Sequence, residues 1–324
     1  MIPYTRKTLP NGLTVVVNRD RASKLAAVNI LYRVGARNEN PARTGFAHLF
    51  EHLMFRGTRA VENFDLPVQM ASGDNNAFTN NDYTDFYITL PKDNLETALW
   101  LESDRMEGLD ITPAKLEAEK KVVIEEFRQR YLNQPYGDQT MLLRALAYKV
   151  HPYRWAAIGL ATDHIAGATL ADVESFYRAH YRPSNAILSI SADMEEERML
   201  ELAEKWFAPL ADHPSATAAI PQEPMQTQAR RQEVERDVPA STVTVAYHMC
   251  ARTKLDFYTA DLVSDLLSGG DSGRLYTHLV KERNLLSSVN AYITGDVDPG
   301  LFVFTGQLLP GVTPEAAEAA FREE

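Results

Sequence analysis

Residues 45–55 read GFAHLFEHLMF, with His48, Glu51 and His52 set among large apolar side chains. Positions i and i+4 lie on one face of a helix, so this spacing predicts that the two imidazoles project side by side. The apolar neighbours indicate a buried helix, where polar side chains without partners are costly. A metal ion would supply that partner. The alternative is a helix with two incidental histidines that neighbouring groups satisfy.

Zinc is the metal that this pattern favours, because two imidazoles one turn apart can reach one ion. A catalytic zinc site takes a third protein ligand and leaves the fourth position to water. Glu51 projects on the same side of the helix without needing to bind the metal. A carboxylate in that place suits a general base that takes a proton from water.

The third ligand is expected on a long helix predicted over residues 113–132, which begins with Thr112 as N-cap and Pro113 at its first position. The carboxylates on this helix are those of Glu117, Glu119, Glu125 and Glu126. Its apolar stripe consists of Leu116, Val123, Ile124, Phe127 and Tyr131. At about 100° per residue, Glu117 lies about 20° from Ile124 and nearest to the stripe. Geometry therefore favours Glu117 over the other three, which are expected on a solvated face.

Strand-like and helical runs are mixed along the chain. Strands are predicted at 12–18, 26–34 and 186–191, and as two runs within 75–90 that a polar turn at 80–82 joins. Helices are predicted at 45–55, 95–106, 169–180 and 195–207. This mixture with hairpin-like pairs predicts an α+β domain, in which an antiparallel-rich sheet packs with helices.

The opening pattern returns after about 215 residues, which predicts a duplicated domain. Residues 243–252 repeat the pattern of 28–37, residues 258–269 that of 46–57, and residues 289–304 that of 75–90. We expect a first domain at 1–212, a linker at 213–230 rich in Pro, Ala and Gln, and a partial second copy at 231–324. Asp261, Ser264 and Asp265 replace the polar triplet there, so no metal site is expected in the second copy.

Composition narrows the classes of partner. Thirty-three Lys and Arg against 44 Asp and Glu give a net charge of −11, which disfavours nucleic acid. The single cysteine, Cys250, excludes a site built from several cysteines. No apolar run reaches the ~20 residues of a membrane helix. The first residues lack the apolar core of a secretory signal. We expect no membrane partner and a cytoplasmic protein, or a periplasmic one if a signal peptide preceded this numbering.

The pattern H-x-x-E-H, with a glutamate on a later helix and a duplicated α+β unit, resembles the inverzincins. These are the peptidases related to pitrilysin, insulin-degrading enzyme and the mitochondrial processing peptidase. The resemblance runs over most of the chain, from the LPNGL of residues 9–13 to the second copy. It implies clamshell-like domains, one zinc ion per chain held by His48, His52 and Glu117, and Glu51 as the catalytic base.

The resemblance also implies a path for a peptide or unfolded polypeptide substrate. Family members bind peptides as an added strand on an edge similar to residues 75–79, which assigns Asn76 and Ala77 to substrate binding. An exposed edge offers unpaired N–H and C=O groups to any extended peptide. The alternative is an ordinary hairpin strand.

One departure from the family concerns the second domain. Single-chain relatives carry an Arg and, seven residues later, a Tyr that reach the substrate, whereas Val280 and Ser287 stand at those places. The hypothesis is a zinc metalloendopeptidase that works with a paralogous subunit or as a homodimer. The alternative is a non-catalytic peptide-binding or scaffold subunit.

Overall fold

The computed structural model describes residues 2–213 and 219–324 and divides into two units. The first comprises Met1–Gln129 and Val150–Glu223, and the second comprises Arg130–Lys149 and Pro224–Glu324, within the described residues. Part of the expected linker, residues 214–218, lies outside the described residues. Residues 219–241 contain no helix or strand. The segment Arg130–Lys149 belongs to the second unit, whereas the expected division placed it in the first domain at 1–212.

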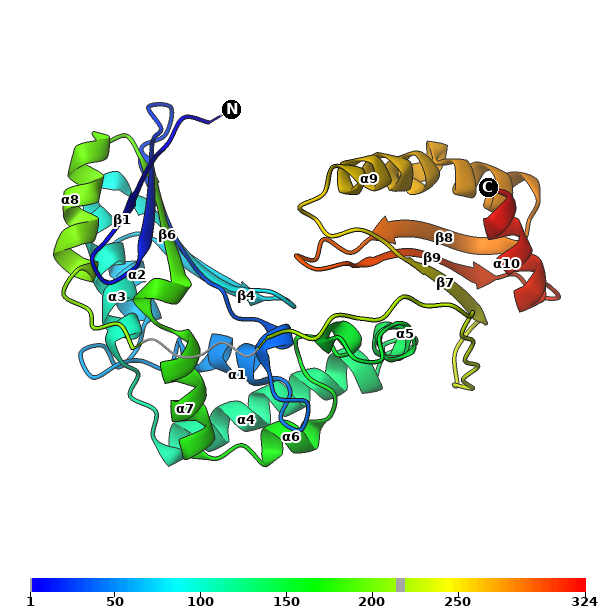
Figure 1. The fold of residues 1–324 in the computed structure, drawn as a ribbon, viewed down its shortest axis with the longest axis horizontal. Coiled ribbons are helices and arrows are strands. Elements are labelled where there is room, and N and C mark those ends of the chain that lie inside the picture. The colour runs from blue at the N-terminus through cyan, green and yellow to red at the C-terminus, as the bar shows by residue number, and fades with distance from the viewer. Residues whose placement is uncertain (1, 214–218) are drawn as a thin grey trace. The chain divides into compact units, whose positions relative to one another are not determined.

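A six-stranded sheet forms the centre of the first unit (Figure 1). Its strands are β1 (Thr5–Thr8), β2 (Thr14–Arg19), β3 (Leu25–Tyr32), β4 (Asp74–Thr79), β5 (Thr84–Pro91) and β6 (Ala186–Ala192). Their order is β1-β2-β6-β3-β5-β4, and all pairs are antiparallel except β2 with β6. Buried and partly exposed residues alternate along β3 and β6, as expected when helices cover one face. The expected antiparallel-rich α+β architecture is confirmed.

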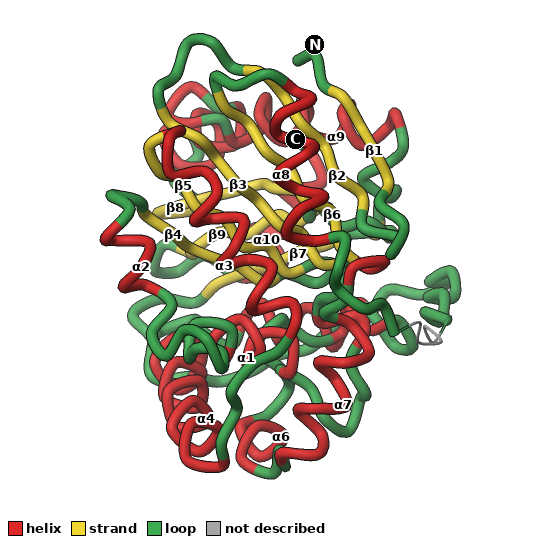
Figure 2. Tube along the Cα trace, turned by 90° about the vertical axis from the view of Figure 1, so that its left-hand side faces the viewer, coloured by secondary structure: helices red, strands yellow, loops and turns green. Residues whose placement is uncertain are grey.

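Helices pack against this sheet in two groups, which Figures 1 and 2 show from two sides. The helices of the first unit are α1 (Phe46–Leu53), α2 (Asp65–Met70), α3 (Leu95–Glu107), α4 (Pro113–Phe127), α6 (Thr162–Ala166), α7 (Leu170–His180) and α8 (Glu196–Phe207). Helices α3 and α8 pack against each other and on the sheet, and the short helix α2 joins this group through its contacts with α3 and β4. Helices α1, α4, α6 and α7 form the second group, in which α1 contacts β4, β5, α4 and α7. The motif helix therefore lies between the end of the sheet and the other helices of this group.

A buried ion pair lies within α3. Arg105 is 1% exposed and makes two hydrogen bonds of 2.6 and 2.7 Å to Glu102, which is fully buried. The guanidinium also lies over the rings of Phe64 and Phe86, at 4.4 and 4.1 Å from their centroids. Burial raises the pKa of Glu102, and Arg105 opposes this effect. Arg105 therefore balances the buried charge of Glu102 within the core of the first unit.

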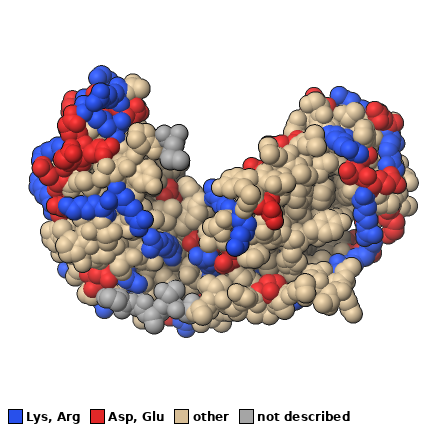
Figure 3. Space-filling view, turned by 45° about the horizontal axis from the view of Figure 1, so that its top comes forward, with Lys and Arg blue, Asp and Glu red and all other residues tan. Residues whose placement is uncertain are grey.

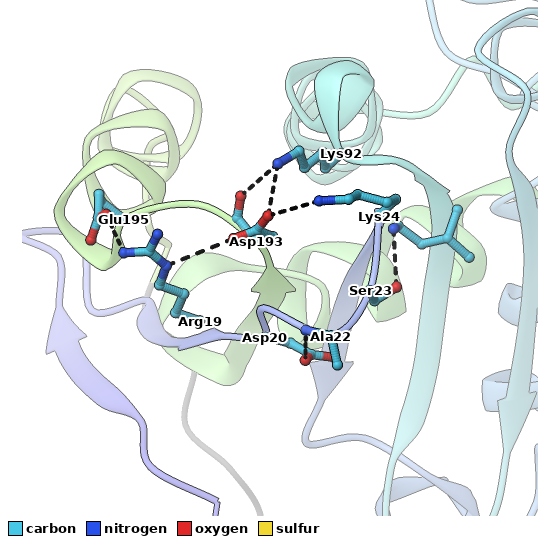
Figure 4. Close-up of polar contacts among 9 residues, drawn as sticks. Arg19, Asp20, Ala22, Ser23, Lys24, Lys92, Asp193 and Glu195 are labelled. Atoms are coloured by element: carbon cyan, nitrogen blue, oxygen red, sulfur yellow. Dashed lines mark hydrogen bonds and ion pairs between the residues drawn. The ribbon is translucent and has the colours of Figure 1, made fainter.

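Ion pairs around Asp193 join four segments at one end of the sheet (Figure 4). Lys92 Nζ lies 3.0 Å from Asp193 Oδ2, and Lys24 Nζ lies 3.4 Å from the same oxygen. Arg19 pairs with both Asp193 and Glu195. The hydrogen bond from Lys92 is the largest cause that lowers the pKa of Asp193. Since each cation has an acidic partner, this cluster fastens the sheet end and is not a site for a bound anion.

The second unit repeats part of the first. Its elements are α5 (Gln139–Ala147), β7 (Thr242–His248), α9 (Leu255–Ser268), the π-helical turn η7 (Tyr276–Glu282), β8 (Leu286–Ile293), β9 (Leu301–Leu308) and α10 (Pro314–Glu323). The strand order β7-β9-β8 matches the order β3-β5-β4 of the first unit. The strands and α9 fall on the segments that the sequence repeat predicts. The helix α5 was not predicted.

Two features bear on possible partners: how the charged side chains are distributed, and how long and apolar the helices are. On the face drawn in Figure 3, basic and acidic side chains lie next to one another on each unit. Ion pairs among the described residues include Arg236 with Asp138 at 2.8 Å and Arg231 with Glu315 at 2.7 Å. The excess of acidic residues is therefore not gathered into one patch on this face. None of the helices among the described residues has the length and apolar character that crossing a membrane requires.

Candidate metal centre

Helix α1 is anchored by its apolar face and by the turn before it. Leu49, Phe50 and Leu53 are fully buried. Gly45 precedes the helix in the left-handed region, with φ at 89°. A Cβ atom there would lie 2.6 Å from the carbonyl oxygen of Ile158, so this turn requires glycine. At about 100° per residue, the polar triplet is centred roughly opposite Phe50 on the helix, and the two leucines lie between these two directions.

His48 and His52 lie side by side on α1, with ring centroids 4.9 Å apart. A carboxylate of α4 reaches both rings, because Glu126 Oε2 lies 3.6 Å from His48 Nε2 and 3.3 Å from His52 Nε2. One ligand atom from each of the three residues lies within 4.8 Å of the other two. Two imidazoles and one carboxylate form a donor set that zinc accepts with a fourth position open. The residues present therefore fit a catalytic zinc ion.

The expectation that Glu117 is the third ligand is corrected here. The Glu117 side chain is 60% exposed, and its Oε1 accepts a hydrogen bond of 2.6 Å from Lys120 Nζ. Glu126 stands nine residues later, which places it on the opposite side of the same helix. The structure thus brings Glu126, and not Glu117, to His48 and His52.

The error has a physical cause in the face that α4 turns toward α1. Glu119, Val123 and Glu126 follow the spacing i, i+4, i+7, so they share one helical face. The side chains of Glu119 and Glu126 are 1% and 18% exposed, whereas that of Glu125 is 53% exposed. The expectation of a solvated face is therefore wrong for Glu119 and Glu126. The face of α4 that lies against α1 carries Glu119 and Glu126, which contact the histidines of the motif. Choosing the glutamate nearest to the apolar stripe of α4 therefore selected the wrong residue.

Glu119 contacts the second ring nitrogen of His52, Nδ1. Its Oε2 lies 3.5 Å from His52 Nδ1, and Arg56 forms an ion pair with its other oxygen. Metal-binding histidines commonly have such a carboxylate on the second ring nitrogen, which fixes the ring orientation. Glu119 therefore turns His52 so that Nε2 faces Glu126.

The two carboxylates also change the protonation of His52. Burial lowers the pKa of His52, but the hydrogen bonds that its ring donates to Glu119 and Glu126 outweigh this effect and raise the pKa to about 9. A metal ligand must be the neutral imidazole, so a metal would have to displace this proton.

Glu51 lies on α1 between the two histidines and is partly buried. Burial raises the pKa of the Tyr181 phenol, and the nearby charge of Glu51 raises it further. The pattern from the sequence is thus preserved in the structure, with Glu51 on the helix that carries both imidazoles.

Strand β4 carries the two residues expected to bind substrate. Among the described strands it pairs with β5 alone, so one side of β4 is an open edge of the sheet. Asn76 is exposed and Ala77 is partly buried. The Ala77 N–H donates to Asn76 Oδ1 at 2.8 Å. This edge adjoins the metal centre, because α1 packs on β4.

A pocket of about 920 Å³ opens beside His52. Apolar side chains from three segments line it, including Phe55, Leu66, Met70 and Trp100, and Arg56 and Glu119 also border it. The sequence did not indicate this pocket, since α2, which supplies Leu66 and Met70, was not predicted. Apolar exposure on a short helix next to the triplet is the signal that could have drawn attention to it.

The second unit presents different residues at the corresponding places. Ser264 is buried, and its Oγ donates to the carbonyl oxygen of Asp261 at 2.8 Å. Val280 packs against the core of the second unit, and Ser287 is exposed on β8. Neither side chain offers the cation or phenol that the family resemblance led us to look for.

Two family profiles match the chain. The profile of Insulinase (Peptidase family M16) matches residues 14–156, and that of the Peptidase M16 inactive domain matches residues 167–324. The protein Zinc protease PqqE of Helicobacter pylori is 33% identical over 317 residues, which cover 96% of this chain and 71% of that protein. The chain belongs to peptidase family M16, and the resemblance to the pitrilysin and insulinase group is confirmed.

Two further proteins bear on the fold and on the family. A solved structure described as a protease from Helicobacter pylori superposes with a TM-score of 0.94 at 31% identity, covering the whole of this chain and 79% of that one. The Probable mitochondrial-processing peptidase subunit beta of Arabidopsis thaliana is 25% identical, over 93% of this chain and 59% of that protein. The chain thus spans 71% and 59% of the lengths of these two curated relatives.

Proposed function

We propose that this chain is a zinc metalloendopeptidase that hydrolyses peptides or unfolded polypeptide segments. The observation that carries the proposal is the meeting of Glu126 Oε2 with the Nε2 atoms of His48 and His52, on the helix that also bears Glu51. The name zinc protease of the Helicobacter pylori relative supports the choice of metal and of reaction.

Each residue of the site has a distinct role in this proposal. His48, His52 and Glu126 would hold one zinc ion. Zinc bound there would polarise a peptide carbonyl and make a water molecule a stronger acid. Glu51 takes a proton from the attacking water and later gives one to the leaving amine. Glu119 keeps His52 in the orientation and tautomer that present Nε2 to the metal.

The open edge of β4 would receive the substrate as an added strand. An extended peptide gains main-chain hydrogen bonds when it pairs with a free sheet edge. Asn76 and Ala77 lie on this edge, and α1 packs on the same strand. In the free chain the Ala77 N–H donates to the Asn76 side chain, so the peptide would have to displace that bond.

A partner subunit is part of the proposal. One relative is named as the beta subunit of a processing peptidase, which supports an arrangement of paralogous subunits or a homodimer. Val280 and Ser287 lack the guanidinium and phenol groups that a complementary subunit would supply. The rival function is a peptide-binding or scaffold subunit without turnover, with which the match of residues 167–324 to the inactive-domain profile is also compatible.

Cleavage of a quenched fluorescent peptide library by the zinc-loaded chain tests the proposal. The assay is run alone and with the nearest paralogue, and Glu51→Gln is compared with Glu117→Gln, an exposed glutamate away from the site. We expect Glu51→Gln to lose roughly 100-fold or more of the cleavage rate while it retains zinc, because a general base contributes at least that much. Zinc binding without cleavage in either mixture would instead support the scaffold function. Wild-type cleavage by Glu51→Gln would exclude Glu51 as the base.

A further inference from the structure

The first turn of α1 receives its cap from a residue that lies outside the helix, six positions before Gly45. Helices begin with N–H groups that have no partner within the helix, and the N-cap residue usually supplies one through its side chain. Gly45 occupies that place and has no side chain. Glu39 takes over this role, since its Oε2 accepts from the Gly45 N–H at 2.8 Å and its Oε1 from the Ala47 N–H at 2.9 Å. Glu39 is 6% exposed, so its carboxyl group makes these bonds inside the protein, where burial raises its pKa to about 8.

The segment that carries Glu39 is fixed on its other side to the β4–β5 hairpin. The Ala36 N–H donates to the carbonyl oxygen of Asn80 at 3.1 Å, and the Arg37 N–H donates to that of Asn81 at 2.9 Å. Both acceptors lie in the turn between β4 and β5. Trp155 Nε1 donates to the carbonyl oxygen of Ala36 at 2.9 Å. Glu39 therefore reaches from a segment that is tied to the hairpin to the start of the motif helix.

This placement links the two parts of the candidate site. Ala47 directly precedes His48, so the hydrogen bond at Ala47 fixes the height and rotation of the turn that carries the first imidazole. The same segment holds the hairpin that contains β4. A functional group must stay within about 0.5 Å of its productive position, and a loose supporting residue is enough to lose that accuracy.

We propose that Glu39 is a positioning residue of the metal centre, which sets α1 against Glu126 and against β4. The proposal rests on the proposed function in one respect, because it takes His48, His52 and Glu126 as the metal ligands. A purely structural cap would stabilise the first unit without altering how tightly a metal binds.

A titration with Co²⁺ separates these two roles. The dissociation constant and the absorption spectrum of bound Co²⁺, which reports coordination geometry, are measured for the wild type, Glu39→Gln and Asp212→Asn. Asp212 is the matched control, since its Oδ1 also accepts a backbone N–H, that of Ser184 at 3.0 Å, away from α1. We expect Glu39→Gln to bind Co²⁺ roughly ten- to a hundredfold more weakly with an altered spectrum, as for other residues behind metal ligands. Asp212→Asn should bind as the wild type does.

Other outcomes overturn the proposal. Wild-type affinity and spectrum in Glu39→Gln, together with a lower melting temperature, would leave Glu39 as a structural cap. An equal loss of affinity in Asp212→Asn would show a general effect of destabilisation. If Glu39→Gln does not fold, Glu39→Asp replaces it, with the same expectation, because the shorter side chain cannot reach both N–H groups. A wild-type chain that binds no Co²⁺ contradicts the proposed function itself, which distinguishes that failure from the failure of Glu39 alone.

Discussion

Two glutamates of α4 differ in exposure and in partners, and this difference predicts different effects on zinc. Glu126 faces both imidazoles, whereas Glu117 pairs with Lys120 at the surface. We expect Glu126→Gln to weaken zinc binding by at least about 100-fold, because it removes the charged oxygen ligand, and Glu117→Gln to bind zinc as the wild type does. Competition with a chromophoric chelator measures both affinities. The reverse order would restore Glu117 as the ligand.

Glu119 is predicted to act on the metal through His52. Removing its charge frees the imidazole to turn, so we expect Glu119→Gln to bind zinc roughly ten- to a hundredfold more weakly. Glu125→Gln is the control on the same helix, because that side chain is 53% exposed and outside the site. The same chelator competition gives both values. Equal affinities for the two variants would mean that Glu119 does not orient His52.

At the scale of residues, the sequence was sufficient for part of the site. The spacing of His48, Glu51 and His52 predicts their common face from helical geometry alone, and the structure retains it. The third ligand depends on which face of α4 meets α1. That face is acidic, so proximity to the apolar stripe led to Glu117 instead of Glu126. A ligand contributed by another helix follows from tertiary packing, which local pattern does not contain.

The open edge of β4 is predicted to contribute to substrate affinity. Proline at position 77 has no N–H, so Ala77→Pro should raise KM for an extended peptide by about three- to tenfold, the effect of one lost hydrogen bond. Zinc affinity should not change. Ala77→Val keeps the N–H and serves as the matched control. Steady-state kinetics with one fluorescent peptide measures the effect, and an unchanged KM in the proline variant would argue against strand addition at this edge.

The end of α7 predicts a dependence of stability on pH. Burial lowers the pKa of His180 to about 4, and Arg182 acts in the same direction. An unfolded histidine titrates near 6.5, so between pH 6.5 and 4 the unfolded chain binds more protons and the free energy of unfolding falls as the pH falls. His180 should account for up to about 3 kcal/mol of this loss.

Urea unfolding at several pH values between 4 and 7 measures this contribution. The variant His180→Gln should show a smaller fall in the free energy of unfolding across that range. The exposed His213 provides the control, since His213→Gln should retain the wild-type slope. Identical slopes for wild type and His180→Gln would contradict the assignment to His180.

At the scale of elements, those with strong local signals could be predicted. Thr112 as N-cap and Pro113 at the first position mark the start of α4, and the structure confirms both, with Thr112 accepting from the Lys115 N–H. The strands β3 and β6 likewise fall on the strand-like runs predicted at 26–34 and 186–191. The helices α2 and α5 escaped prediction because they are short, at six and nine residues, and neither has a side-chain cap at its N-terminus.

At the scale of the whole molecule, the duplication could be predicted and the division of the chain could not. The repeat in sequence corresponds to the repeated strand order of β3-β5-β4 and β7-β9-β8. The segment Arg130–Lys149 lies in sequence within the first copy, yet it packs with the second unit. Gln139 Nε2, for example, donates to Thr305 Oγ1 on β9 at 3.2 Å. The turn residues of 133–138 (NQPYGD) separate α5 from α4, but a turn does not indicate which unit the next helix joins.

X-ray absorption at the zinc edge of the zinc-loaded chain tests the central claim most directly, because it reports the ligands themselves. We predict one zinc ion per chain with two imidazole nitrogens at about 2.0–2.1 Å and oxygen ligands at about 2.0–2.2 Å. The imidazole signal should weaken in His48→Ala and in His52→Ala. Zinc that is bound without imidazole scattering, or a chain that retains no zinc, would contradict the metal centre formed by His48, His52 and Glu126.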